Sequence, residues 1–175
     1  FLNLETFQIV ESDLRELNYH GIFKFNPDSK ELSIVTKEIS VPNGLALSPD
    51  EKFLYVKKMG VFDESPKVLK LNLENKKIST LFDGREISRK HGGDFDGIKV
   101  HSSGNIFFSG GGGILIINPA GDLLARINFG NATNCAFDSG EKYLYVTGHL
   151  DNTKVFRIKL KNSPTLGKAT KIKTH

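Results

Sequence analysis

Three segments of the chain can be laid over one another, and this repeat limits the fold more than any other feature of the sequence. Each segment starts with Asn or Asp, forms a short apolar strand, turns through polar residues and continues into a second strand; the segments span 43–56, 96–108 and 134–146. A third strand follows each hairpin, and a clear fourth strand follows the first two. Four short strands per repeated unit are typical of a β-propeller blade, whereas a β-sandwich would not predict that the units align.

The rest of the chain also reads as short strands joined by turn residues, and no helix is predicted. The sequence therefore predicts an all-β propeller, with blade units near 21–37, 43–83, 96–129 and 134–173 in a single domain over 1–175. These units amount to about three and a half blades, at the lower edge of what closes a ring. An open half-ring would expose strand edges, so the rest of the ring is expected from residues before the first one or from another chain.

Composition excludes several classes of protein. No run approaches the 18 apolar residues of a membrane-spanning helix. A content of 38% hydrophobic and 25% charged residues is typical of a soluble globular chain. The sequence leaves the compartment of the protein open. The single cysteine, Cys135, excludes an internal disulfide and a cysteine-rich zinc site, and we expect it to be buried. The net charge is +4, but the lysines are interspersed with acidic residues, which argues against a nucleic-acid surface.

Asn43, Asp96 and Asn134 hold the same position in the three units, at the start of the first strand. Because the first strand of each propeller blade lines the central channel, we expect these residues to converge at one mouth of the channel. Carboxylate and amide oxygens suit a hard cation such as Ca²⁺ better than Zn²⁺, which prefers His or Cys. Asn and Asp before Gly are also common turn formers, so a purely structural role stays open. His149 follows the second strand of the last unit and is placed either to face this pocket or to lie in an exposed loop.

Two further motifs argue against other enzyme classes. Gly110–Gly113 could cradle a phosphate, but no helix follows it, so a tight turn is expected rather than a dinucleotide site. Ser109 is not within the Gly-x-Ser-x-Gly motif of a serine hydrolase. His101 lies in a hairpin turn, which the repeat places at the opposite mouth of the channel.

Several motifs follow one another in a fixed order along the chain: Val41-Pro42-Asn43-Gly44-Leu45-Ala46-Leu47-Ser48-Pro49-Asp50, Leu54-Tyr55-Val56, Asp96-Gly97-Ile98-Lys99-Val100, Gly111-Gly112-Gly113-Ile114 and Thr133-Asn134-Cys135-Ala136-Phe137. This ordered set resembles the gluconolactonase and senescence-marker protein (regucalcin) family of six-bladed propellers. Arg15-Glu16-Leu17 followed by Gly21-Ile22-Phe23 resembles its bacterial gluconolactonase-like branch in particular. The resemblance extends to about Leu160, and by it this chain would be the C-terminal part of such an enzyme.

The resemblance implies a divalent-metal-dependent lactonase that opens a sugar lactone to its hydroxy acid. It implies that Asn43 and Asp96 are two ligands of the cation, with Ca²⁺ favoured, and that Asp96 also steers or deprotonates the attacking water. Asn134 would hydrogen-bond a sugar hydroxyl or support the metal ligands from behind. His149 is a candidate substrate contact by its place in the repeat, where it faces the pocket. The family's third ligand, a glutamate near the start of its fold, has no counterpart in this sequence.

Two departures from the family pattern lie near these residues. Phe95 replaces the usual Pro before Asp96. Lys57 and Lys58 follow Leu-Tyr-Val where small or acidic residues are usual, on the expected rim of the site. Both departures, Phe95 included, are expected on this rim, so they bear on the identity of the substrate more than on metal binding. The alternative function is a propeller that binds a sugar or a protein at its polar channel mouth without catalysis.

Overall fold

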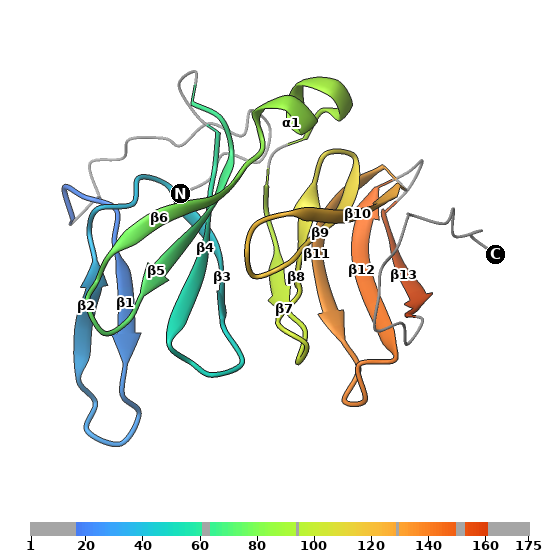
Figure 1. Ribbon diagram of the computed structural model, residues 1–175. Coiled ribbons are helices and arrows are strands. Elements are labelled where there is room, and N and C mark those ends of the chain that lie inside the picture. The colour runs from blue at the N-terminus through green and yellow to red at the C-terminus, as the bar shows by residue number, and fades with distance from the viewer. Residues whose placement is uncertain (1–16, 61–63, 94, 129, 150–152, 161–175) are drawn as a thin grey trace. The chain divides into compact units, whose positions relative to one another are not determined.

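The computed structural model describes residues 17–60, 64–93, 95–128, 130–149 and 153–160. The chain divides into two compact units between Ser40 and Val41. In the described residues, strands make up nearly all of the regular structure, and one short helix accompanies them (Figure 1). The all-β fold predicted from the sequence is therefore confirmed, while the assignment of 1–175 to a single domain stays a prediction.

The first unit contains one antiparallel hairpin, formed by β1 (Ile22–Phe25) and β2 (Leu32–Thr36). The side chain of Asn26 closes its turn by accepting the backbone N–H groups of Asp28 at 3.0 Å and Ser29 at 3.3 Å. This is the local hydrogen bonding that makes Asn a turn former.

The second unit contains three antiparallel sheets that follow one another along the chain (Figure 1). In each sheet the strands lie side by side in sequence order, which is the up-and-down order of a propeller blade. Four strands are described in each of the first two sheets and three in the last. The strands are β3 (Pro42–Leu47), β4 (Phe53–Lys58), β5 (Lys67–Asn72) and β6 (Ile78–Asp83); β7 (Ile98–Val100), β8 (Ile106–Gly110), β9 (Gly113–Ile117) and β10 (Leu123–Asn128); and β11 (Asn131–Phe137), β12 (Tyr143–His149) and β13 (Thr153–Lys159).

Helix α1 (Arg85–His91) lies in a segment where the sequence predicted no helix. The carboxylate of Asp83 accepts the N–H of Arg85 at 2.9 Å, and Glu86 lies in the first turn, where acidic side chains favour a helix. The helix has seven residues and none of them is buried, so its sequence carries no apolar periodicity that could reveal it. Within the described part of the chain, no helix is long and apolar enough to cross a membrane.

The turn between β8 and β9 consists of Gly111 and Gly112, whose φ angles are 54° and 72°. A two-residue hairpin loop of type I′ needs positive φ at both of its central positions, which glycine adopts without steric cost. The tight turn predicted at Gly110–Gly113 is therefore confirmed.

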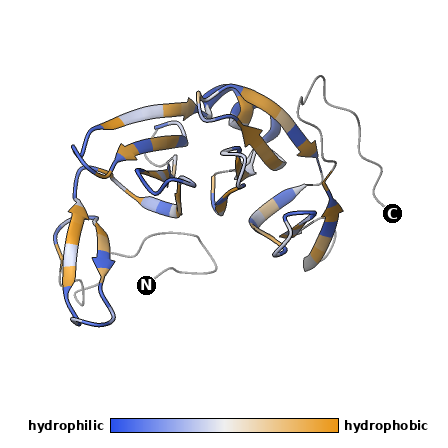
Figure 2. Ribbon diagram, turned by 60° about the horizontal axis from the view of Figure 1, so that its bottom comes forward, coloured by the Kyte–Doolittle hydropathy of each residue, from blue (hydrophilic) through white to orange (hydrophobic). Residues whose placement is uncertain are grey.

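Hydrophobic side chains fill the two spaces between the three sheets. One cluster, around Phe95 and Phe108, lies between the first and second sheets, and another, around Phe107 and Leu144, lies between the second and third. Strand β8 contributes to both clusters because its alternate residues point to opposite faces of the second sheet. All five residues of β8 are therefore buried, and Figure 2 shows hydrophobic residues along the strands of these sheets.

Candidate functional site

The three residues that the repeat singles out lie on or beside adjacent first strands. Asn43 is in β3, Asp96 precedes β7 and Asn134 is in β11, and β7 contacts both β3 and β11. A Cβ atom added to Gly44 would stand 2.5 Å from the carbonyl oxygen of Asp96. A Cβ atom added to Gly97 would collide with the side chain of Asn134. The three positions therefore form a row at one end of the three sheets, which we call the candidate site.

Strand irregularities accompany two of these positions. The pairing of β3 with β4 shifts register between Pro42 and Leu45, at Asn43, and the pairing of β11 with β12 shifts between Ala132 and Asn134. Such bulges are common beside functional sites, where they turn a side chain out of the regular alternation. Both asparagines are exposed.

The side chain of Asn134 is oriented by its own backbone. Its Oδ1 atom accepts the N–H of Cys135 at 2.8 Å, so the amide NH₂ group is the part that it presents to a ligand. Cys135 itself is buried, as predicted, and this burial raises the pKa of its thiol to about 11. The pair therefore offers a hydrogen-bond donor at the surface and an unreactive thiol beneath it.

The donor chemistry of Asn43 and Asp96 fits a hard cation. Together they provide a carboxylate and an amide oxygen, Asn43 is exposed and Asp96 is half-buried, so water oxygens can complete a coordination shell. In the residues that the structure describes, no three His, Cys, Asp or Glu side chains are grouped as a metal site. A cation in the row would therefore depend on amide and water oxygens as well as on the carboxylate of Asp96.

A buried polar network lies beside the candidate site. Lys57 in β4 has no exposed surface, and its ammonium group donates to the carbonyl oxygens of Ser109 at 2.9 Å and Gly97 at 3.4 Å. The hydroxyl of Ser109 and the N–H of Gly97 both donate to the carbonyl oxygen of Thr133, at 3.0 and 2.8 Å. These bonds connect all three sheets of the second unit.

Lys57 and Phe95 are both fully buried, which corrects the sequence prediction that they lie on the rim of the site. Strand β4 is covered on both faces, so four consecutive residues, 54–57, are buried and the polar–apolar alternation of a half-exposed strand is absent. The unbroken apolar run Leu54-Tyr55-Val56 directly before Lys57 was the signal that could have indicated this. Lys58, the next residue, is half-buried and forms an ion pair with Glu64.

His149 is the last residue of β12, where its backbone pairs with Asn131 and Thr153. Its side chain lies outside the described residues. The expectation that it faces the pocket therefore stays a prediction.

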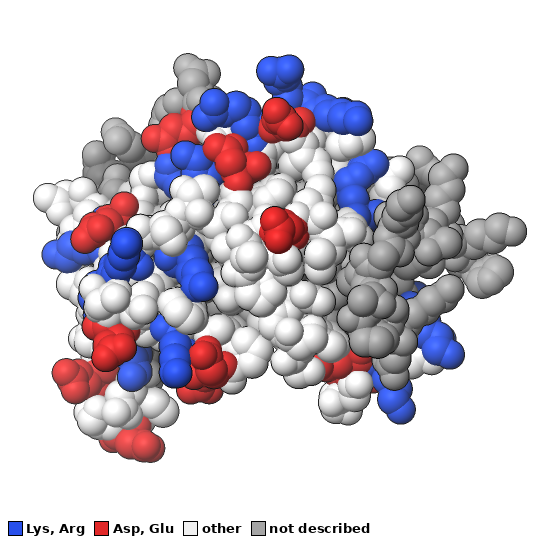
Figure 3. Space-filling model, viewed as in Figure 1, with Lys and Arg blue, Asp and Glu red and all other residues white. Residues whose placement is uncertain are grey.

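A cavity of about 660 Å³ lies beside α1, and no residue of the candidate site lines it. Figure 3 shows basic and acidic side chains interspersed around the helix, so the cavity carries no charge of a single sign. Burial, together with the charges of Arg126 and Lys90, lowers the pKa of His91 at its edge. The lining residues are Phe82, Asp83, Arg85, Glu86, Ile87, Lys90, His91, Leu123 and Arg126.

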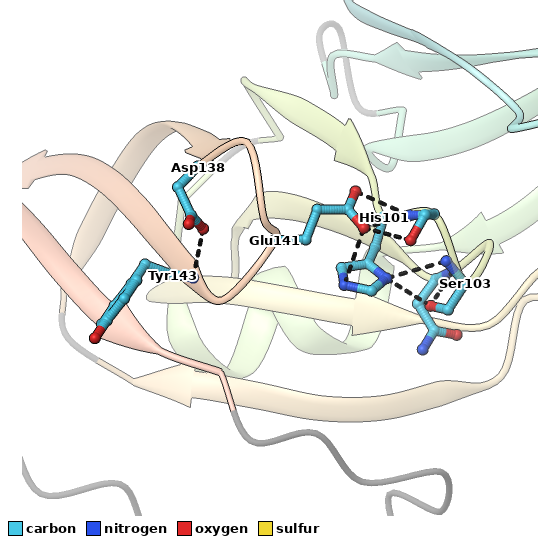
Figure 4. A network of polar contacts seen from close by, with 7 residues as sticks. His101, Ser103, Asp138, Glu141 and Tyr143 are labelled. Atoms are coloured by element: carbon cyan, nitrogen blue, oxygen red, sulfur yellow. Dashed lines mark hydrogen bonds and ion pairs between the residues drawn. The ribbon is translucent and has the colours of Figure 1, made fainter.

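At the opposite end of the sheets, His101 lies between Ser103 and Glu141 (Figure 4). Its Nδ1 atom is 2.9 Å from the hydroxyl of Ser103, and its Nε2 atom is 3.4 Å from the carboxylate of Glu141. This order of groups resembles a Ser–His–acid triad, but the backbone N–H of Ser103 also donates to Nδ1, at 3.0 Å. Because that bond occupies the lone pair a general base would need, we interpret the group as a contact that fastens two hairpin turns.

Comparison with known proteins places this geometry in a family. Residues 9–149 match the family described as the SMP-30/Gluconolactonase/LRE-like region. A gluconolactonase from Zymomonas mobilis is 34% identical over 150 residues, which cover 78% of this chain and 40% of that protein. A lactonohydrolase from Aspergillus oryzae is 30% identical over 151 residues, which cover 74% of this chain and 32% of that protein. The chain thus spans two fifths or less of the length of these curated relatives.

Solved structures agree with the sequence match. A gluconolactonase from Xanthomonas campestris superposes with a TM-score of 0.66 at 29% identity, covering 76% of this chain and 43% of that chain. Regucalcin, a calcium-binding protein from Agrobacterium tumefaciens, superposes with a TM-score of 0.59 at 22% identity, covering 75% of this chain and 46% of that chain, and this likeness concerns the fold alone. The fold is that of part of a β-propeller, and the chain belongs to the SMP-30/gluconolactonase/LRE-like family.

Proposed function

We propose that this protein is a divalent-metal-dependent lactonase that opens a sugar lactone to its hydroxy acid. The observation that carries the proposal is the row of Asn43, Asp96 and Asn134 on or beside adjacent first strands, in which both asparagines are exposed and Asp96 is half-buried. The relatives named gluconolactonase and lactonohydrolase support lactone hydrolysis as the reaction class. We favour Ca²⁺ because the donors are hard oxygens and because Ca²⁺ accepts a flexible coordination geometry.

In this proposal Asn43 and Asp96 hold the cation, which when bound would polarise the lactone carbonyl. The remaining steps belong to the protein. The half-buried carboxylate of Asp96 orients a water molecule and accepts its proton as the water oxygen attacks the carbonyl carbon. The acyl carbon–oxygen bond then breaks as Asp96 returns its proton to the ring oxygen, which becomes a hydroxyl. The carboxylic acid formed from the attacking water loses its remaining proton to solvent and leaves as a carboxylate.

Substrate recognition falls to Asn134 and His149 in the same proposal. Since Oδ1 of Asn134 accepts the N–H of Cys135, the NH₂ group donates to a ring hydroxyl of the sugar. His149 is proposed as a second substrate contact at the end of β12.

The test is hydrolysis of glucono-1,5-lactone, monitored through the acid that is released. The assay is run at slightly acidic pH, where the lactone opens slowly without an enzyme. We expect activity that is lost with a chelator and restored by Ca²⁺. Asp96→Asn should lower kcat by about 10²-fold or more, because it keeps an amide oxygen but removes the negative charge beside the cation and the proton acceptor. The matched control is Asp28→Asn, in the exposed turn between β1 and β2, which should leave the rate unchanged.

Two results would contradict the proposal. Full activity in Asp96→Asn would remove this carboxylate from the mechanism. A protein that binds the sugar but neither hydrolyses the lactone nor binds Ca²⁺ would favour the alternative, a propeller that only binds ligands at its channel mouth.

A further inference from the structure

We propose that Lys57 is a positioning residue of the candidate site: its buried ammonium group fixes the backbone segments that carry Asn43, Asp96 and Asn134. What the site binds rests on the proposed function, whereas the fixing of the backbone does not.

The first step is the burial of a charge. Lys57 is the one charged side chain among the buried residues that the structure describes. A buried ammonium group is costly unless acceptors surround it. Here the carbonyl oxygens of Ser109 and Gly97 turn toward Nζ, and the hydroxyl of Ser109 lies 3.5 Å away. Such charge-assisted bonds are stronger than bonds between neutral groups, so they restrain the two carbonyl groups.

The surroundings of the ammonium group hold it in place. The rings of Phe95 and Phe108 lie with their centroids 5.4 and 5.8 Å from Nζ, within the range of a cation–π contact. Both rings belong to the hydrophobic cluster between the first and second sheets. The lysine therefore cannot leave its acceptors without disturbing packed aromatic side chains.

The second step is the connection from this charge to the row. Gly97 directly follows Asp96, and Thr133, which accepts bonds from Gly97 and Ser109, directly precedes Asn134. In its own sheet, Lys57 stands opposite the bulge of β3, because Lys58 pairs with Pro42 and Val56 pairs with Leu45. That bulge contains Asn43. The ammonium group thus bonds to the residue after Asp96 and, through Gly97 and Ser109, is connected to the peptide before Asn134, while the backbone of Lys57 lies opposite the bulge that contains Asn43.

The third step follows from the mechanism. A carboxylate that holds a cation and orients water must keep its position to within a fraction of an ångström. The bond from Lys57 to the carbonyl of Gly97 restrains the peptide next to Asp96. Lys57 has no exposed surface and does not reach the substrate, so its effect should appear in metal affinity and kcat rather than in KM.

The experiment compares Lys57→Met, which keeps an unbranched side chain one atom shorter and removes the ammonium group, with Lys70→Met. Lys70 lies in the same sheet with its ammonium group over the ring of Phe53 at 4.0 Å, and it serves as the matched control. Amide hydrogen exchange by NMR and Ca²⁺ titration by calorimetry are measured well below the melting temperature. In Lys57→Met we expect at least tenfold faster exchange of the Ser109 and Gly97 amides and at least tenfold weaker Ca²⁺ binding. At saturating Ca²⁺ we expect kcat to fall at least tenfold while KM for glucono-1,5-lactone changes less than threefold. In Lys70→Met the amide exchange rates, the Ca²⁺ affinity, kcat and KM should each stay within twofold of the wild type.

Unchanged exchange of these two amides in Lys57→Met would overturn the proposal. Faster exchange with unchanged Ca²⁺ affinity and kcat would show a packing role only, and would also overturn it. If Lys57→Met does not fold, Ser109→Ala replaces it, because this variant removes the hydroxyl contacts to Lys57, Gly97 and Thr133 and keeps the backbone of Ser109. It should shift the same measurements in the same direction by about threefold, and no shift would overturn the proposal. A wild-type protein that neither binds Ca²⁺ nor opens the lactone would overturn the proposed function, while the exchange rates still decide the role of Lys57.

Discussion

Gly97→Ala should destabilise the protein, because the candidate site is built on a close approach of two strands. A Cβ atom at this residue would lie 2.5 Å from Cγ and 2.6 Å from Cα of Asn134, well inside ordinary van der Waals contact. The Cα atom belongs to the backbone of β11, so a change of side-chain rotamer cannot relieve the clash and a strand must shift.

The magnitude follows from these distances. Overpacking of a well-packed region typically costs about 1–3 kcal/mol. The lost backbone freedom of the unfolded chain offsets about 0.4–1 kcal/mol of that cost. We therefore expect Gly97→Ala to lower the free energy of unfolding by about 1–2 kcal/mol, which for a chain of this size lowers the melting temperature by about 2–8 °C.

The assay is urea unfolding followed by circular dichroism, with Gly140→Ala as the matched control. Gly140 lies in the turn after β11, where the nearest atom to an added Cβ is 3.6 Å away, so alanine fits there. The control should be as stable as the wild type or slightly more stable. The reasoning is refuted if Gly97→Ala is no less stable than Gly140→Ala.

Two further predictions concern the core. Phe108→Ala should lower the free energy of unfolding by about 3–5 kcal/mol, because the ring is fully buried and packs edge-on against Phe95 and Phe82, at centroid distances of 5.0 and 5.7 Å. The same urea experiment on Phe25→Ala, at a residue that is 56% exposed, should show a change of about 0.5 kcal/mol or less. Because burial raises the pKa of Cys135 from 9.0 to about 11, the thiol should be inert to iodoacetamide at pH 8 in the native protein and should react on unfolding. The thiol of the unfolded chain loses its proton at lower pH than the buried thiol does, so the contribution of Cys135 to stability is present below pH 9 and lost as the pH rises toward 11. Urea unfolding measured across this pH range should show the loss in the wild type and not in Cys135→Ala.

The sequence could predict the hairpins because their turns are stabilised by local hydrogen bonds. The hydroxyl of Ser48 accepts the N–H of Phe53 at 3.0 Å, and the carboxylate of Asp138 accepts the N–H of Tyr143 at 2.7 Å. Both bonds connect residues five positions apart, so the residue types that make them recur at fixed spacing in the repeat. The same locality explains why the predicted strands agree with the observed ones.

The features that the sequence did not reveal depend on contacts between sheets. The burial of Lys57 follows from its place between the first and second sheets, and its partners Gly97 and Ser109 are far away along the chain. Helix α1 escaped prediction for a different reason, since seven residues with no buried face leave no pattern to read. For the candidate site, the repeat indicated which residues hold equivalent positions, but only the structure shows what lies against them.

The two ends of the sheets are joined in different ways, and this difference explains why the candidate site lies where it does. At the end with the row, glycines let the strands approach by their backbones: Gly44 lies against Asp96, and the N–H of Gly97 donates directly to Thr133 in the next sheet. At the other end, side chains span the gap between sheets, as Glu141 does by accepting the N–H of Ser102 at 3.0 Å. Functional groups from different sheets can meet around one small ligand only where the backbones are close. A larger residue at Gly44 or Gly97 would therefore separate the members of the row before it disturbed the hydrophobic clusters.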